Sequence, residues 1–170
     1  MTQFNETYPE MVRNLFKPLP TIGEQVHHAT TGISGEVAEL ADAVTRENII
    51  EEIGDLCFYC EALRQQLGDV DPLAEGWKNQ VAPLGNLMMT LSIIAGRMLD
   101  LTKKVWIYGK PLPVLPLTLE LSMFEGLLSQ LCELLGTSIV EVQAINQAKL
   151  MKRYPSGYTN EAAIARADKV

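Results

Sequence analysis

Apolar residues recur every three or four positions along most of the chain, the spacing that places them on one face of an α-helix. Four long apolar series follow this spacing, from Ile22 to Val44, from Ile49 to Leu67, from Leu87 to Val105 and from Leu117 to Leu135. No segment alternates convincingly between apolar and polar residues, as a half-buried strand would. The pattern therefore predicts an all-α protein made of two helix hairpins, at residues 21–67 and 84–135, with short flanking helices.

Signals for helix ends divide the chain further. Thr21 with Glu24, and Ser138 with Glu141, form capping boxes that predict two helix starts. Proline and glycine residues between positions 68 and 83 predict a connector, and a Tyr-Pro-Ser-Gly sequence at 154–157 predicts the end of the last long helix. We therefore expect a single domain with a first half at 21–67, a connector at 68–83, a second half at 84–153 and a C-terminal tail at 154–170.

Four acidic residues stand in mirror-image order within the first half. They are Glu36 and Glu39, followed by Glu52 and Asp55. Each pair has i, i+3 spacing, which places both carboxylates of the pair on one face of a helix. Both pairs share a midpoint between residues 45 and 46. If the chain turns there as an antiparallel hairpin, Glu39 faces Glu52 and Glu36 faces Asp55.

The segment 45–48 contains no glycine or proline, so a straight helix over residues 32–67 is a second interpretation. In a straight helix Glu39 and Glu52 would lie ~20 Å apart, and a shared site would need acids from a second chain. The symmetry of the acids favours the turn, and Thr45 is a suitable N-cap for the helix that would follow it.

Four clustered carboxylates repel one another unless a cation neutralises them. Ligand sets made only of oxygen suit Mg²⁺, with Mn²⁺ as an alternative, and Mg²⁺ commonly works together with a substrate phosphate. Either acid pair alone is more often a solvated helix face. Both pairs in mirror register favour a metal site at Glu36, Glu39, Glu52 and Asp55.

The two halves resemble an internal repeat, because Leu-Gly closes each predicted hairpin, at 67–68 and 135–136. In this alignment Asp42 matches Asp100 and Glu52 matches Glu120, whereas the other three acids align with or near Ile94, Arg97 and Met123. The second half instead carries a basic segment with Lys103, Lys104 and Lys110. We interpret the chain as tandem hairpins that form a four-helix-bundle-like pseudo-dimer, with a catalytic first half and a degenerate second half.

Composition and charge limit the classes of function. Of the 170 residues, 47% are hydrophobic, which indicates a globular protein, and the net charge of −7 argues against a nucleic-acid partner. No apolar run reaches ~18 residues, so no membrane span is expected. The first residues lack the pattern of a signal peptide, and three cysteines argue against a disulfide framework. These features favour a cytoplasmic location.

The segment HATTGISGEVAELADAV at 28–44, followed by EEIGDL at 51–56, resembles the MazG-like nucleotide pyrophosphohydrolases of the all-α NTP pyrophosphatase superfamily. The run NQAKLMKRYPSG at 146–157 also resembles the end of that family's motif, and so does KKVWIYGKPL at 103–112. In the family the latter segment normally follows the first acidic helix, so its place in the second half is a departure.

The resemblance implies Mg²⁺-dependent cleavage of a nucleoside triphosphate, expected to be a deoxynucleotide, into a monophosphate and pyrophosphate. It implies that the four acids hold the metal ion. The groups that would bind the phosphates are Asn146, Lys149 and Arg153, together with Lys103, Lys104 and Lys110. A homodimer is expected, because related enzymes bury helical faces between subunits. The alternative is a non-catalytic interaction or nucleotide-binding module on a degenerate scaffold, which the missing basic loop in the first half favours.

Overall fold

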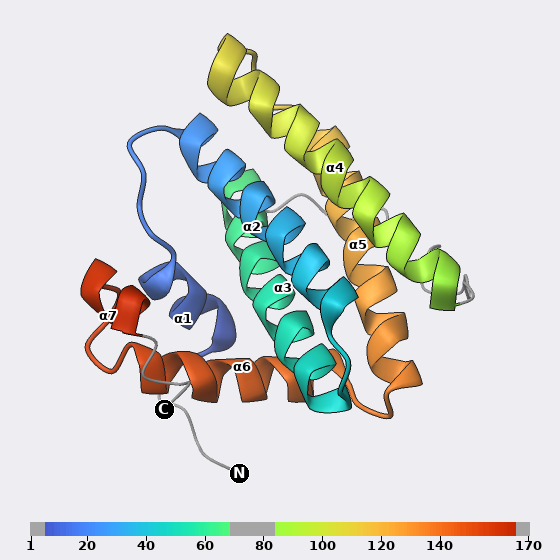
Figure 1. Cartoon of the computed structure of the whole chain (residues 1–170). Coiled ribbons are helices and arrows are strands. Elements are labelled where there is room, and N and C mark those ends of the chain that lie inside the picture. Colours follow the sequence, from blue (N-terminus) through green and yellow to red (C-terminus); the bar gives the residue numbers. More distant parts are fainter. Residues whose placement is uncertain (1–5, 69–83, 166–170) are drawn as a thin grey trace.

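The computed structural model describes residues 6–68 and 84–165, and Figure 1 shows how they are arranged. Helices occupy most of these residues: α1 (Tyr8–Leu15), α2 (Ile22–Asp42), α3 (Arg46–Leu67), α4 (Leu84–Tyr108), α5 (Val114–Leu134), α6 (Ile139–Arg153) and α7 (Asn160–Ala165). Neither described segment contains a β-strand. The all-α class predicted from the apolar spacing is therefore confirmed.

Helices α2 and α3 form one hairpin, and α4 and α5 form a second hairpin beside it (Figure 1). Helix α2 packs against both α3 and α4, while α3 also packs against α5. Helix α6 crosses one end of the first hairpin, and α1 packs against both α3 and α6. The two predicted hairpins thus form a helical bundle, and their relation as the halves of a pseudo-dimer stays a prediction.

The four apolar series supply the core between these helices. Ile33, Leu56, Met98 and Phe124, one from each series, are each 0% exposed. The last member of the first series, Val44, is 89% exposed, because α2 ends two residues before it. That series was therefore predicted slightly too long, since an apolar residue after the end of a helix no longer follows its buried face.

The predicted turn in the first half is present, and the interpretation of one straight helix over 32–67 is wrong. Helix α2 ends at Asp42 and α3 begins at Arg46. The hydroxyl of Thr45 accepts a hydrogen bond from the backbone N–H of Asn48 at 3.2 Å, as an N-cap does. The guanidinium of Arg46 donates to the carbonyl of Leu135 at 2.9 and 3.0 Å, which satisfies an acceptor at the end of α5.

Other predicted boundaries agree with the structure. Both capping boxes start helices, at Thr21 for α2 and at Ser138 for α6. Gly68 and Gly136 follow α3 and α5 with φ angles of 77° and 67°, in the left-handed region that glycine adopts readily. Residues 69–83 of the predicted connector lie outside the described residues. The segment predicted as a tail contains α7, and its residues 166–170 also lie outside the description.

No helix of the described chain combines the length and the apolar character that crossing a membrane requires.

Candidate metal centre

Three of the four predicted acids converge across the turn between α2 and α3. One carboxylate oxygen each from Glu36, Glu39 and Glu52 lies within 4.8 Å of the other two. Two opposite ligands of an octahedral Mg²⁺ ion lie about 4.2 Å apart, because each oxygen is about 2.1 Å from the ion. A small side-chain rotation would therefore bring the three oxygens to a common cation. Within residues 6–68 and 84–165, this is the only group of three or more such ligands that could hold a metal.

The carboxylates in this cluster are electrostatically unfavourable without a cation. Burial, followed by the charges of Asp55, Glu39 and Glu52, raises the pKa of Glu36 to about 8. Burial and the neighbouring acids Asp55 and Glu39 also raise the pKa of Glu52. Each shift shows that the surroundings disfavour the charged form. A bound divalent cation would reverse this by stabilising the ionised carboxylates.

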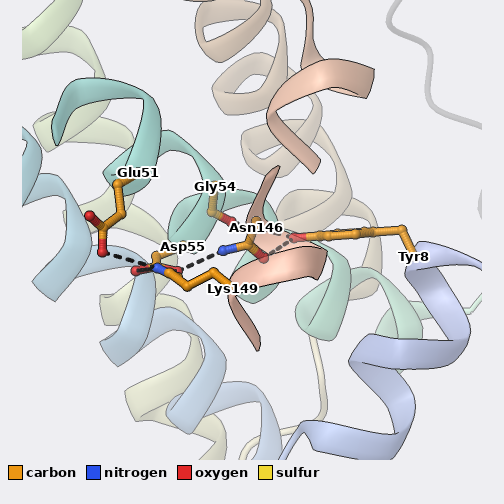
Figure 2. A network of polar contacts seen from close by, with 6 residues as sticks. All are labelled: Tyr8, Glu51, Gly54, Asp55, Asn146 and Lys149. Atoms are coloured by element: carbon orange, nitrogen blue, oxygen red, sulfur yellow. Dashed lines mark hydrogen bonds and ion pairs between the residues drawn. The ribbon is translucent and has the colours of Figure 1, made fainter. Parts of the chain in front are cut away.

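Asp55 is held by polar side chains from α6 rather than joining the group of three. Lys149 contacts both carboxylate oxygens of Asp55 through Nζ, at 2.5 and 2.6 Å, and approaches Glu51 at 3.5 Å. The amide nitrogen of Asn146 donates to Asp55 Oδ1 at 2.7 Å. Figure 2 shows these contacts, which join α6 to α3. Two residues of the predicted C-terminal motif thus reach an acid of the site, and the predicted role of both in phosphate binding stays a prediction.

Tyr8, a residue that the sequence reasoning missed, extends this network. Its hydroxyl donates to Asn146 Oδ1 at 2.9 Å and lies 3.4 Å from the carbonyl oxygen of Gly54. The sequence does carry a signal for the helix that holds Tyr8, because Thr7 and Glu10 form a capping box that begins α1. The buried residues of that helix, Tyr8, Met11, Val12 and Leu15, have helical spacing.

A cleft of about 260 Å³ adjoins the acidic residues. Three acids, Glu36, Glu39 and Asp55, line it together with two basic residues, Lys17 and Arg153. The remaining wall is mostly aromatic, with Phe16, His28, Phe58, Tyr59, Tyr154 and Tyr158. The cleft therefore joins carboxylates, cationic side chains and flat apolar surfaces in one space.

Glycine shapes the aromatic wall where α2 meets α3. A Cβ atom at Gly32 would come within 2.4 Å of the Tyr59 ring. Only a glycine therefore lets this ring lie so close to the α2 backbone, one turn before Glu36. Phe16 stacks on His28, with 4.6 Å between the ring centroids.

Lys103, Lys104 and Lys110 do not line this cleft. Lys103 and Lys104 form ion pairs with Asp100 on their own helix, at 2.7 and 2.6 Å. Lys110 is exposed in the loop after α4. The predicted role of these three residues in phosphate binding stays a prediction.

The C-terminal part of α4 lies beside the N-terminal half of α2, away from the glutamates in the second half of α2. The Thr102 and Thr30 hydroxyls are 2.6 Å apart, and the ring of Trp106 stacks on His27 with a centroid distance of 4.6 Å. These contacts fix the position of the basic segment relative to the first hairpin.

The corresponding positions of the second half carry an ion pair. Arg97 and Glu120, which align with Glu39 and Glu52, approach each other to 3.7 Å between α4 and α5. A shallow hollow beside them is lined by both residues and by Asp100. The second half therefore has an internal cation at the place where the first half has a carboxylate.

Comparison of the chain with protein-family models, with curated proteins and with solved structures finds no match.

Proposed function

We propose that the protein is a Mg²⁺-dependent hydrolase that cleaves nucleoside triphosphates, with deoxynucleotides as the expected substrates, into a monophosphate and pyrophosphate. The convergence of Glu36, Glu39 and Glu52 from two helices carries this proposal, and Asp55 lines the same cleft as Glu36 and Glu39. Mn²⁺ would suit the same oxygen ligands. The resemblance of the acidic segments and of the run at 146–157 to MazG-like enzymes supplies the reaction.

The residues fit the cation that this reaction needs. Glu36, Glu39 and Glu52 would hold it, and Asp55 beside them would be the fourth ligand. When bound, such an ion polarises a phosphate and lowers the pKa of a coordinated water. A carboxylate of the cluster that the ion leaves partly free would accept the proton of that water.

The cleft also offers partners for the rest of the substrate. A triphosphate carries about four negative charges, and charge-assisted hydrogen bonds to Lys or Arg are among the stronger polar contacts. Arg153 and Lys17 line the cleft, and Lys149 contacts Asp55, which also lines it. The aromatic wall is suited to a flat base, which binds well between apolar surfaces with a few polar groups.

Two further parts of the proposal concern the setting of the enzyme. We place it in the cytoplasm and expect a homodimer. Met89 and Ile93 are exposed one turn apart on α4 and offer apolar contacts for a second copy. Light scattering that finds a strict monomer at micromolar concentration would contradict the dimer but not the activity.

Pyrophosphate release from a panel of ribonucleotides and deoxynucleotides, canonical and damaged, tests the function. The expected result is Mg²⁺-dependent release of pyrophosphate, which a chelator abolishes. Release of orthophosphate would contradict the reaction class. No release from any nucleotide would support the alternative of a non-catalytic module.

A further inference from the structure

A chain of polar contacts links α1 to the acidic centre through α6. The Tyr8 hydroxyl donates to the amide oxygen of Asn146, and the amide nitrogen of Asn146 donates to Asp55. Figure 2 shows the Tyr8 ring approaching Asn146 from the side opposite Asp55. Asn146 is only 2% exposed, so water offers its amide little alternative. The orientation of this amide therefore depends on the two residues that flank it.

The groups around the Asn146 side chain allow only one orientation of its amide. The Asp55 carboxylate and the Gly54 carbonyl only accept, while the Lys149 ammonium only donates. Burial, with smaller contributions from the charges of Cys57 and Asp55, raises the pKa of Tyr8 far above its usual value, so the phenol stays protonated and donates. The amide oxygen of Asn146 must then face Tyr8. The reversed amide would place its oxygen against the Asp55 carboxylate.

The backbone positions of Asn146 and Asp55 are fixed by close packing of α6 on α3. A Cβ atom added at Gly54 would lie 2.9 Å from the Cβ of Asn146 and 3.1 Å from its Nδ2 atom. Glycine at this point lets the two helices approach each other. Because the backbone is fixed, the Asn146 side chain can change only by rotating its amide group. The hydrogen bond from the Tyr8 hydroxyl opposes that rotation.

We propose that Tyr8 is a positioning residue for the acidic centre, because its hydroxyl fixes the Asn146 amide in the orientation that holds Asp55 Oδ1. Tyr8 lies on α1, outside every segment that carries the family resemblance. Partners that orient the ligands of a metal typically change metal affinity by 10–100-fold when they are removed. Since Tyr8 acts through Asn146, its loss should weaken metal binding by about three- to tenfold, and the loss of Asn146 should weaken it more. The metal-binding consequence rests on the proposed function.

The variant Tyr8→Phe tests this inference, because it removes the hydroxyl and keeps the ring. Val12→Ala is the matched control, since Val12 is fully buried on the same helix and its truncation lowers stability while the Tyr8 hydroxyl is kept. Calorimetric titration of each full-length, metal-free protein with Mn²⁺ measures affinity. A second readout needs no metal: the side-chain amide resonances of Asn146 in ¹⁵N-labelled protein, assigned by their loss in Asn146→Ala.

Tyr8→Phe should weaken Mn²⁺ binding about three- to tenfold, shift the Asn146 amide resonances and speed their exchange with solvent. Val12→Ala should lower the melting temperature but leave both readouts unchanged. Wild-type affinity in Tyr8→Phe, or an equal loss of affinity in Val12→Ala, would overturn the inference. If the wild-type protein binds no Mn²⁺, the proposed function fails, and the amide resonances decide: unchanged signals in Tyr8→Phe overturn the positioning role, and shifted signals support it.

Discussion

The two hairpins place opposite electrostatics at aligned positions. In the first hairpin, Glu39 and Glu52 meet as two carboxylates with Glu36 beside them. In the second hairpin, Arg97 and Glu120 meet as an ion pair. The second arrangement is neutral by itself, whereas the first needs a cation from outside the protein. A bound cation is therefore expected at the first hairpin, where the charges of the clustered carboxylates are not balanced.

One acid in each half shows the contrast, because the pKa of Asp100 and the pKa of Glu36 shift in opposite directions. Hydrogen bonds from Lys103 and Lys104 lower the pKa of Asp100 in the second half to about 2. In the first half, burial and three neighbouring acids raise the pKa of Glu36 to about 8. Asp100 is therefore stabilised as an anion by its own helix, and Glu36 is not stabilised by its surroundings.

The covering helices add to the contrast. Helices α1 and α6 pack on α3 of the first hairpin, and α6 supplies Asn146 and Lys149 to Asp55. The packing of α6 on α5 of the second hairpin is slighter. Helices α1 and α6 thus pack on the hairpin that carries the four acids, and α6 adds polar partners for one of them.

Replacement of one acid in the first hairpin should have the largest effect on activity. If activity were unchanged, the contrast between the two hairpins would be wrong. Glu39→Gln or Asp55→Asn should abolish pyrophosphate release and weaken metal binding, because an amide supplies neither the charge nor all the lone pairs of a carboxylate. Helicity should be retained in circular dichroism. Glu120→Gln is the matched control in the second hairpin and should keep full activity. Wild-type turnover in Glu39→Gln would refute the site.

Removal of Lys149 should have the next largest effect. Its side chain is only 13% exposed and contacts both Asp55 and Glu51, so Lys149→Ala removes a positive charge that lies beside both acids. We expect kcat/KM to fall by about 10–100-fold, or ~1.4–2.7 kcal/mol, while metal binding survives. Lys104→Ala, which breaks a contact within α4, tests the basic segment in parallel. If neither substitution changes kinetics by more than about twofold, the idea that these lysines serve the phosphates is wrong.

Much of the difference between the two hairpins could be predicted from the sequence, because it depends on the spacing of residues within single helices and turns. The i, i+3 acids, the N-cap at Thr45 and the capping boxes are decided by residues a few positions apart. The pairing of Lys103 and Lys104 with Asp100 was also readable, since the spacings are i, i+3 and i, i+4 on one helix. From the sequence, these lysines were considered as partners for phosphate or as charges near a helix C-terminus, and Asp100 was not considered as their partner.

The contacts of Asp55 could not be predicted in the same way. Lys149 is 94 residues from Asp55, and Tyr8 is 138 residues from Asn146. Which of several lysines reaches an acid depends on how α6 crosses α3, and that crossing depends on the close approach at Gly54. Such geometry follows from packing of the whole bundle rather than from any local pattern.

A smaller effect should appear in the stability of the metal-free protein as a function of pH. The folded state raises the pKa of Glu36 from 4.5 to about 8, so between these values the folded protein binds more protons than the unfolded chain. Stability therefore falls as pH rises through this range. Allowing for solvent screening, we expect about 1 kcal/mol, or roughly 2–4 °C in melting temperature, between pH 6 and pH 8 in a chelator. Saturating Mg²⁺ should oppose this fall, and Glu36→Gln should reduce it. A metal-free protein that is more stable at pH 8 would contradict the assigned cause.

The smallest effect should come from the ion pair of the second hairpin. The Arg97 side chain is 58% exposed and its distance to Glu120 is 3.7 Å, so water screens the attraction between them. Pairs of this kind contribute about 0–1 kcal/mol to stability, because ordering two long side chains offsets most of the gain. Arg97→Gln should therefore change the free energy of unfolding in urea by less than about 1 kcal/mol. Pyrophosphate release should remain at the wild-type rate. A strong loss of activity in Arg97→Gln would show that the second hairpin takes part in the chemistry, and the contrast between a catalytic and a structural half would then fail.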